Sequence, residues 1–151
     1  MTGHSIFMVS TILHRDLPGH TGRAWERVVS LQSDHNFHRL RRWGKYHWYH
    51  IRILERLNKP VLRKRRKRLR KLQLALGDAH DLTLLQAFLR SEENADEHLL
   101  EHVRRRKKEL YEQAIKTGRK IFSVPASELV AGLSRYWADQ RKNKNEHGSL
   151  G

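Results

Sequence analysis

Apolar residues along the chain recur at the three- and four-residue spacing of amphipathic helices, and this pattern predicts an all-α protein. No segment alternates apolar and polar residues as a strand would. The three prolines, at 18, 60 and 125, fall where helical patterns begin or restart. We therefore expect an antiparallel helical bundle, with helices at about 21–31, 35–57, 60–77, 78–90, one that opens within 91–97, and one at about 127–140.

Residues at several predicted helix ends suit capping. Ser33 or Asp34 can cap the helix at 35–57, because a short polar side chain accepts hydrogen bonds from the free N–H groups of a helix start. Gly77 suits the left-handed position after a helix end, and Asp78 can then cap the next helix. The sequence thus predicts two separate helices that meet at Gly77.

The helix at 35–57 has two different faces. At 100° per residue, one side collects basic side chains and a phenol, which we call the basic face: His38, Arg41, Arg42, Lys45, Tyr49, Arg52 and Arg56. The opposite side carries Phe37, Leu40, Gly44, His47 and Ile51. The helix is therefore expected to pack by the second side and to present the first, which from His38 to Arg52 extends over about 21 Å at 1.5 Å per residue.

The next helix repeats this bias. A thin leucine stripe is surrounded by Arg63, Lys64, Arg65, Arg66, Lys67, Arg68, Arg70 and Lys71. Like charges at this spacing repel one another. Few acids lie nearby, so an external anion is the expected partner of both helices.

Composition supports a polyanionic partner and bounds the chemistry. The 151 residues include 31 Lys+Arg and 16 Asp+Glu, a formal net charge of +15. Nucleic acid, inorganic polyphosphate, an anionic membrane surface and an acidic protein would all satisfy that charge. The chain has no cysteine, which excludes disulfides, Cys-ligated zinc and thiol catalysis, and is compatible with a cytoplasmic location. The apolar stretch at 5–13 reads as neither a membrane span nor a signal peptide.

Aromatic residues among the basic ones keep nucleic acid open as an alternative, because bases can stack on them. Trp43, Tyr46 and Trp48 border the apolar side, so core packing is the favoured interpretation for most of them. Tyr49 lies within the basic face, where its hydroxyl can donate to an anion. Phosphate recognition without base stacking would then suffice.

Two quoted stretches resemble the conserved histidine α-helical domain (CHAD) family: "FHRLRRWGKYHWYHIRIL" at 37–54 and "LRKLQLALGDAHDLTLL" at 69–85. The residues that fit its motifs are His38, Arg41, Arg42, Lys45, Trp48, Tyr49, Leu76, Gly77, Asp78, His80, Asp81 and Leu82. The resemblance covers about 21–142 and is closest to the C-terminal half of the family's domain. It implies a half-domain at 21–142, an N-terminal extension at 1–20 and a flexible basic tail at 143–151.

The resemblance implies two pseudo-symmetric helical halves around a basic groove that binds inorganic polyphosphate, and association with polyphosphate granules. The expected polyphosphate-binding residues are His38, Arg41, Arg42, Lys45, Tyr49, Arg52, Arg63, Arg66, Arg70 and His80. For His80, together with Asp81, capping of the following helix is the favoured alternative.

Catalysis is not expected. His98, Glu101 and His102 have the H-x-x-E-H spacing of a metal site, but the segment is acidic, lies near a helix start and has no obvious distal ligand. The sequence has no P-loop, no Ser/His/Asp motif and no Glu-x-Glu-x-Lys motif of the triphosphate-tunnel enzymes that often accompany the family. We therefore predict a non-catalytic protein without cofactor or metal; an accessory module of a phosphohydrolase is a further alternative.

A half-domain also predicts self-association. An apolar surface that includes Trp48 and Ile51 would be exposed unless a second chain covers it. Two-fold pairing would cover this surface and bring two basic faces to a shared groove. We therefore expect a homodimer.

Overall fold

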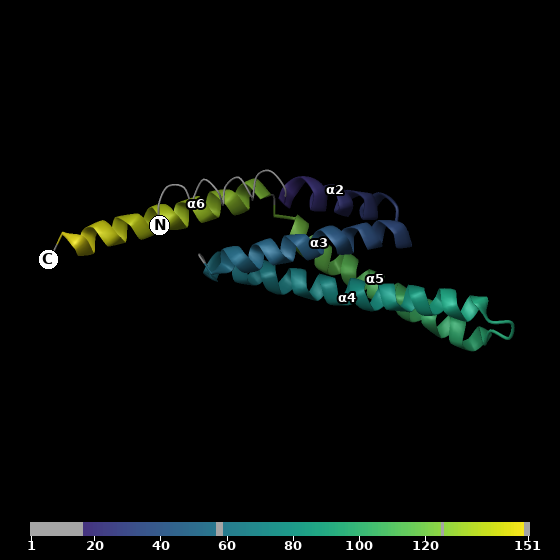
Figure 1. The fold of residues 1–151 in the computed structure, drawn as a ribbon. Helices are drawn as coiled ribbons and strands as arrows, with labels where there is room; N and C mark the ends of the chain where they lie inside the picture. The colour runs from purple at the N-terminus through teal and green to yellow at the C-terminus, as the bar shows by residue number, and fades with distance from the viewer. Residues whose placement is uncertain (1–16, 57–58, 125, 150–151) are drawn as a thin grey trace.

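The computed structural model describes residues 17–56, 59–124 and 126–149, which form five α-helices and no strand (Figure 1). These are α2 (Leu17–Ser30), α3 (Asp34–Glu55), α4 (Lys59–Ser91), α5 (Glu97–Phe122) and α6 (Ala126–Gly148). The all-α helical bundle is confirmed. Residues 1–16 of the predicted N-terminal extension, with the apolar stretch at 5–13, lie outside the described residues. None of the described helices combines the length and the apolar character needed to cross a membrane.

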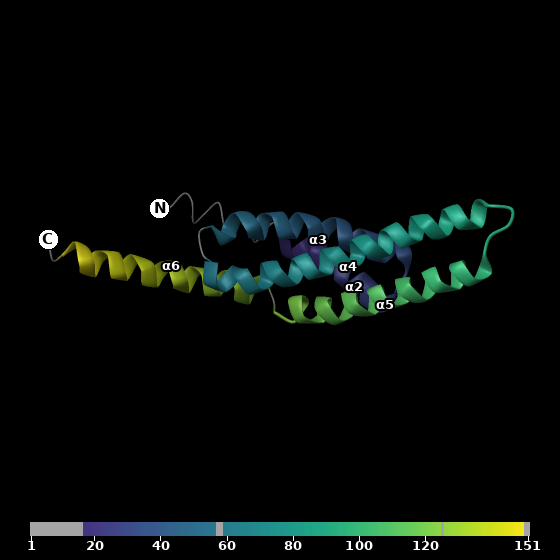
Figure 2. The same ribbon diagram turned by 90° about the horizontal axis from the view of Figure 1, so that it is seen from below.

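Helix α4 is central, because it packs against α3 on one side and α5 on the other. Helix α2 lies on α3 and also touches α5. Figures 1 and 2 show that the end of α4 and the start of α5 continue beyond α3 as a helical hairpin, while α6 projects from the opposite end of the molecule. The long α3–α4 and α4–α5 seams are therefore where most side chains from different helices meet.

The buried side of α3 is the one that its spacing predicts. Phe37, Leu40, Gly44, His47 and Ile51 are all buried, and Leu54 extends the stripe by one turn. From α4, the buried leucines are Leu62, Leu69, Leu72 and Leu76. Burial of each large apolar side chain contributes roughly 1.5–3 kcal/mol, so these two stripes account for much of the stability of the α3–α4 pair.

The predicted helix break at Gly77 is wrong. Helix α4 runs without interruption from Lys59 to Ser91, and no glycine among the described residues has a positive φ. Glycine inside a helix costs about 1 kcal/mol relative to alanine. Here Leu76 and Ala79 on either side are buried, so packing against α3 and α5 offsets that cost. Asp78 is therefore not an N-cap, and His80 and Asp81 cap no helix start.

The predicted starts of α3 and α5 agree better with the structure than the break at Gly77. The Ser33 hydroxyl accepts a hydrogen bond from the Asn36 backbone N–H (3.2 Å) and caps α3. Asp96 caps α5 by accepting from the N–H groups of His98 (2.9 Å) and Leu99 (3.3 Å). Helix α6 continues to Gly148, so residues 143–148 of the predicted tail are helical.

The surface expected to need a second chain is partly covered within this one. Ile51 is fully buried, and Trp48 is partly buried against the hydrophobic core. Ile53 and Leu74 nearby remain exposed, and the homodimer stays an untested prediction.

A polar cluster fixes the start of α3 to the other helices. The Lys107 ammonium of α5 donates to Asp34 Oδ2 (3.0 Å) and to Gln86 Oε1 of α4 (3.0 Å). The Tyr111 hydroxyl donates to Asp34 Oδ1 (2.8 Å), and its ring stacks on Phe37 at a centroid distance of 3.8 Å. Burial alone would raise the pKa of Asp34, but the hydrogen bonds from Lys107 and Tyr111 outweigh it and lower that pKa. Burial and the adjacent Asp34 raise the pKa of Tyr111.

Replacement of Asp34 by Asn should reduce stability in a pH-dependent way. The folded-state pKa of Asp34 is depressed, so its contribution is present above the unfolded pKa and is lost as pH falls through the folded value. Allowing for the half-exposed carboxylate, we expect a loss of about 1 kcal/mol at pH 7. Urea denaturation of both proteins at pH 7 and near pH 3 measures this, with Asp139→Asn, an exposed carboxylate of α6, as the control. A deficit that is equally large at both pH values would contradict the charge-based role.

Replacement of Gly118 by Ala should destabilise the packing of α2 on α5. A Cβ at Gly118 would overlap the ring of Trp25, which also stacks on Phe122 at 5.2 Å. We expect a net loss of about 1–3 kcal/mol from overpacking. Gly22→Ala in α2 is the matched control, because a Cβ there meets nothing within 4 Å. The control should gain up to about 1 kcal/mol from helix propensity, and thermal unfolding followed by circular dichroism compares the two; equal gains by both would show that Trp25 does not restrict Gly118.

Candidate anion-binding groove

A groove between α3 and α4 collects part of the predicted basic surface. It has a volume of about 310 Å³ and is lined by Arg41, Lys45, Trp48, Tyr49, Arg70, Gln73 and Leu74. We call it the α3–α4 groove. The predicted binding residues that it brings together are Arg41, Lys45 and Tyr49 from α3 and Arg70 from α4. The described residues that line it include no carboxylate, so its positive charge is not neutralised locally.

A glycine lets the two helices approach closely beneath this groove. A Cβ at Gly44 would overlap the side-chain amide of Gln73. With its amide turned to satisfy both groups, Gln73 donates to the Arg41 carbonyl oxygen (3.0 Å) and accepts from the Lys45 backbone N–H (3.2 Å). Gln73 therefore anchors the α3 turn that bears two of the groove's cations.

A second cavity continues the same helix–helix seam. It measures about 300 Å³ and is lined by Asp34, His35, Phe37, His38, Leu76, His80, Thr83 and Tyr111. We call it the histidine cavity. The rings of His38 and His80 lie 5.1 Å apart and face each other from α3 and α4. Arg41, one turn after His38, passes close to Gly77, with its Nε 3.9 Å from where a Cβ of that glycine would stand.

The electrostatics of the histidine cavity favour neutral His38 in the absence of an anion. Burial is the main cause that lowers the pKa of His38, followed by repulsion from His80 and Arg41. Near neutral pH the imidazole can thus donate one hydrogen bond. Asp34, the carboxylate of this cavity, is held by Lys107 and Tyr111.

The remaining predicted residues have different environments. Arg52 lies over the Trp48 ring, with its guanidinium carbon 5.4 Å from the ring centroid, which places it beside the α3–α4 groove. Arg66 forms an ion pair with Glu55 at the end of α3, so its charge is compensated. Arg42 and Arg63 are exposed and line neither cavity. Of the residues predicted to form one basic surface, Arg41, Lys45, Tyr49 and Arg70 therefore lie together in the α3–α4 groove. His38 and His80 lie in the histidine cavity beside this groove.

Three groove residues were not among the predicted binding residues. Trp48 was interpreted as a core residue, and it both packs on the core and lines the groove. Gln73 and Leu74 carry no charge that would single them out. The one available signal was spacing, because Gln73 follows Arg70 by three positions and Arg66 by seven, and so shares their side of α4.

In the segment with the metal-site spacing, His98 to His102, the carboxylate is paired within its own helix. Glu101 forms an ion pair with Arg104, three residues further along α5. Among the residues that the structure describes, no three His, Asp or Glu side chains are grouped so that they could hold a metal ion.

Comparison with known families gives a match to the CHAD domain. The model of the CHAD domain matches residues 12–90, slightly more than half of the chain. The matched range includes α2, α3 and all but the last residue of α4, and therefore both walls of the groove, whereas α5 and α6 lie beyond it. No curated protein and no solved structure matches. Since the family model spans the helices that carry the basic face and both quoted motifs, the chain belongs to the CHAD domain family.

Proposed function

We propose that this protein binds inorganic polyphosphate, without a catalytic step, along the α3–α4 groove and the adjoining histidine cavity. The observation that carries the proposal is the convergence of Arg41, Lys45 and Arg70 in one groove whose described lining includes no carboxylate. CHAD domains are associated with polyphosphate, and membership of the family supports this ligand. The proposed location is the cytoplasm, on polyphosphate where it accumulates in granules.

The chemistry of the groove suits a phosphate chain. Arg41 and Arg70 supply planar guanidinium groups that can each donate two parallel hydrogen bonds to phosphate oxygens. Lys45 adds a compact charge, and the half-exposed Tyr49 can donate from its hydroxyl. Because these donors come from successive turns of α3 and from the facing side of α4, they suit a ligand with regularly repeated charge.

Nucleic acid is the second candidate, and it rests on a separate observation. Tyr46 and Tyr49 on α3 are 50% and 46% exposed, and exposed rings beside cations can stack on bases. Inorganic polyphosphate presents dense charge and no bases. The two candidates therefore differ in whether single-stranded RNA or duplex DNA displaces polyphosphate at matched phosphate concentration.

We expect polyphosphate to remain bound in a competition titration at ~0.15 M salt when RNA or DNA is added at equal phosphate concentration. Equal displacement by nucleic acid would remove the preference for polyphosphate. In the same assay, Lys45→Gln combined with Arg70→Gln should weaken polyphosphate binding about 10- to 100-fold, because two charge-assisted contacts are lost.

The matched control for that variant is Arg105→Gln combined with Lys108→Gln. Both control residues are exposed on α5 and line neither the α3–α4 groove nor the histidine cavity. Their substitution removes two positive charges, as the groove variant does. Circular dichroism checks that helix content is unchanged in both proteins. If the control weakens binding as much as the groove variant, net charge rather than the groove governs binding.

Affinity for polyphosphate should rise as pH falls from about 8 to about 5.5. His38 has a lowered pKa in the free protein, and a bound polyanion raises it, so the complex binds more protons than the free protein. The His38→Gln variant should show a flatter pH profile, and His102→Gln, an exposed histidine of α5, should retain the wild-type profile. Dissociation constants from titrations across this pH range test the point. A wild-type profile in His38→Gln would contradict the assignment of the proton uptake to His38.

A further inference from the structure

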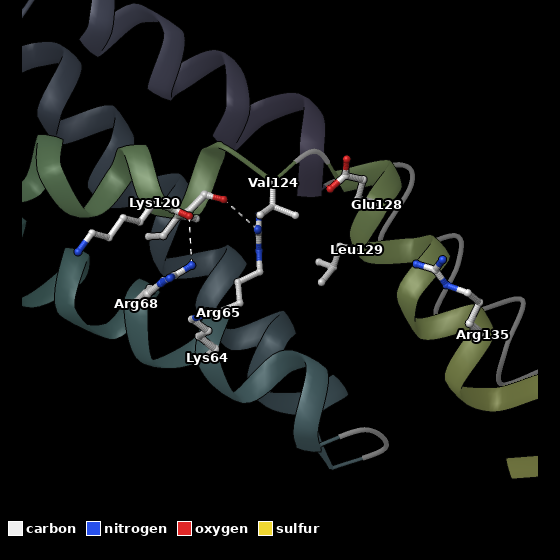
Figure 3. A pocket seen from close by; sticks show the side chains of 9 residues that line it. Lys64, Arg65, Arg68, Lys120, Val124, Glu128, Leu129 and Arg135 are labelled. Atoms are coloured by element: carbon white, nitrogen blue, oxygen red, sulfur yellow. Dashed lines mark hydrogen bonds between the residues drawn. The ribbon is translucent and has the colours of Figure 1, made fainter. Parts of the chain in front are cut away.

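A third cavity lies on the opposite flank of α4, where α5 ends and α6 begins (Figure 3). Its volume is about 550 Å³, and it is lined by Lys64, Arg65, Arg68, Lys120, Ile121, Val124, Glu128, Leu129 and Arg135. We call it the α4–α6 cavity. It shares no described lining residue with the α3–α4 groove or the histidine cavity. Its size is within the range of about 300–1,000 Å³ that is usual for small-molecule sites.

Two arginines of this cavity are fixed in place by the protein. Arg65 donates from Nε to His47 Nε2 (3.0 Å) and from a terminal nitrogen to the Ile121 carbonyl oxygen (3.1 Å). Arg68 donates to the Lys120 carbonyl oxygen (3.3 Å). Figure 3 shows both side chains extending from α4 to the last turn of α5. Each guanidinium has five N–H donors, so both retain donors for a ligand after these bonds are made.

The charge of the cavity is unbalanced. Five cationic side chains line it and Glu128 is the one carboxylate among its described lining residues. Burial, and next the charge of Arg68, lower the pKa of Arg65 to about 10, so Arg65 is still a cation at neutral pH. An anion placed near Arg65 and Arg68 would relieve their repulsion.

The rest of the lining is unsuited to a ligand made only of phosphates. Ile121 and Val124, at and just after the end of α5, and Leu129 of α6 are its apolar lining residues. Glu128 stands in the first turn of α6 next to Leu129 (Figure 3). A carboxylate repels phosphate, but it accepts hydrogen bonds from hydroxyl or amino groups. The cavity thus combines cations from α4, α5 and α6 with an apolar part and one hydrogen-bond acceptor.

We propose that the α4–α6 cavity binds a small organic phosphate of the nucleotide class. Its phosphates would contact Lys64, Arg65, Arg68 and Lys120. Its neutral part would lie against Ile121 and Leu129 and donate a hydrogen bond to Glu128. This site is distinct from the proposed polyphosphate groove and does not depend on it.

Isothermal titration with ATP and with inorganic triphosphate, without divalent cations, tests the proposal. The measurements use a protein that carries Arg41→Gln, Lys45→Gln and Arg70→Gln, so that the α3–α4 groove contributes little. We expect ATP to bind at least about 10-fold more tightly than triphosphate, whose charge is similar but which has no neutral part. Glu128→Gln should bring the affinities for ATP and triphosphate closer together. The substitution removes the carboxylate that repels triphosphate, and it leaves a weaker hydrogen-bond acceptor for ATP.

In the same background, Lys64→Gln combined with Lys120→Gln should weaken ATP binding about 10-fold or more. Both lysines are exposed, so the substitutions should leave the fold intact, which thermal unfolding checks. Arg105→Gln combined with Lys108→Gln removes equal charge outside the cavity and should leave ATP binding within about twofold. Equal affinities for ATP and triphosphate, no binding of ATP at millimolar concentration, or equal losses in the cavity and control variants would each overturn the proposal.

Discussion

The burial of one narrow leucine stripe on α4 is the constraint on which the other features of the structure depend. Leu62, Leu69, Leu72 and Leu76 have to be covered, and two helices, α3 and α5, do so from different sides. This double contact keeps α4 helical through Gly77, where a glycine in an isolated helix would favour an end. Because α4 stays helical through that point, His80 lies on the same seam as Arg70 and opposite His38.

The same packing divides the cations of α4 between two flanks. Arg66 and Arg70 lie toward α3, where Arg66 is paired with Glu55 and Arg70 enters the α3–α4 groove. Lys64, Arg65 and Arg68 lie toward the end of α5 and line the α4–α6 cavity. The basic residues of α4 look alike in the sequence but have different roles in the structure. Some form ion pairs, some donate to the last carbonyl groups of α5, and some line one of two separate cavities. The difference arises from which helix each residue meets.

The hydrogen bond from Arg65 to the buried His47 has a structural role. His47 is buried in the apolar stripe of α3, where burial and the charge of Arg65 lower its pKa to about 3, so its ring is neutral and accepts a hydrogen bond from Arg65 Nε. The same guanidinium reaches the Ile121 carbonyl at the end of α5, where free carbonyl groups attract cations. Arg65 thereby joins three helices at the point where α3, α4 and α5 meet. The imidazole supplies a neutral acceptor that an ordinary core residue would lack.

The sequence by itself determined the features that depend on neighbours three or four positions away. The two faces of α3, the cap at Ser33 and the gathering of His38, Arg41 and Lys45 on one side of a helix follow from local spacing and side-chain chemistry. Tertiary structure decided the rest, since the outcome depended on residues far apart in the chain. The continuity of α4 through Gly77, the neutralisation of Arg66 by Glu55, the anchoring of Arg65 on His47 and the burial of Ile51 within one chain all require a second helix at a set distance. Helical periodicity fixes the direction in which a side chain points, but the packing of other helices fixes what it meets there.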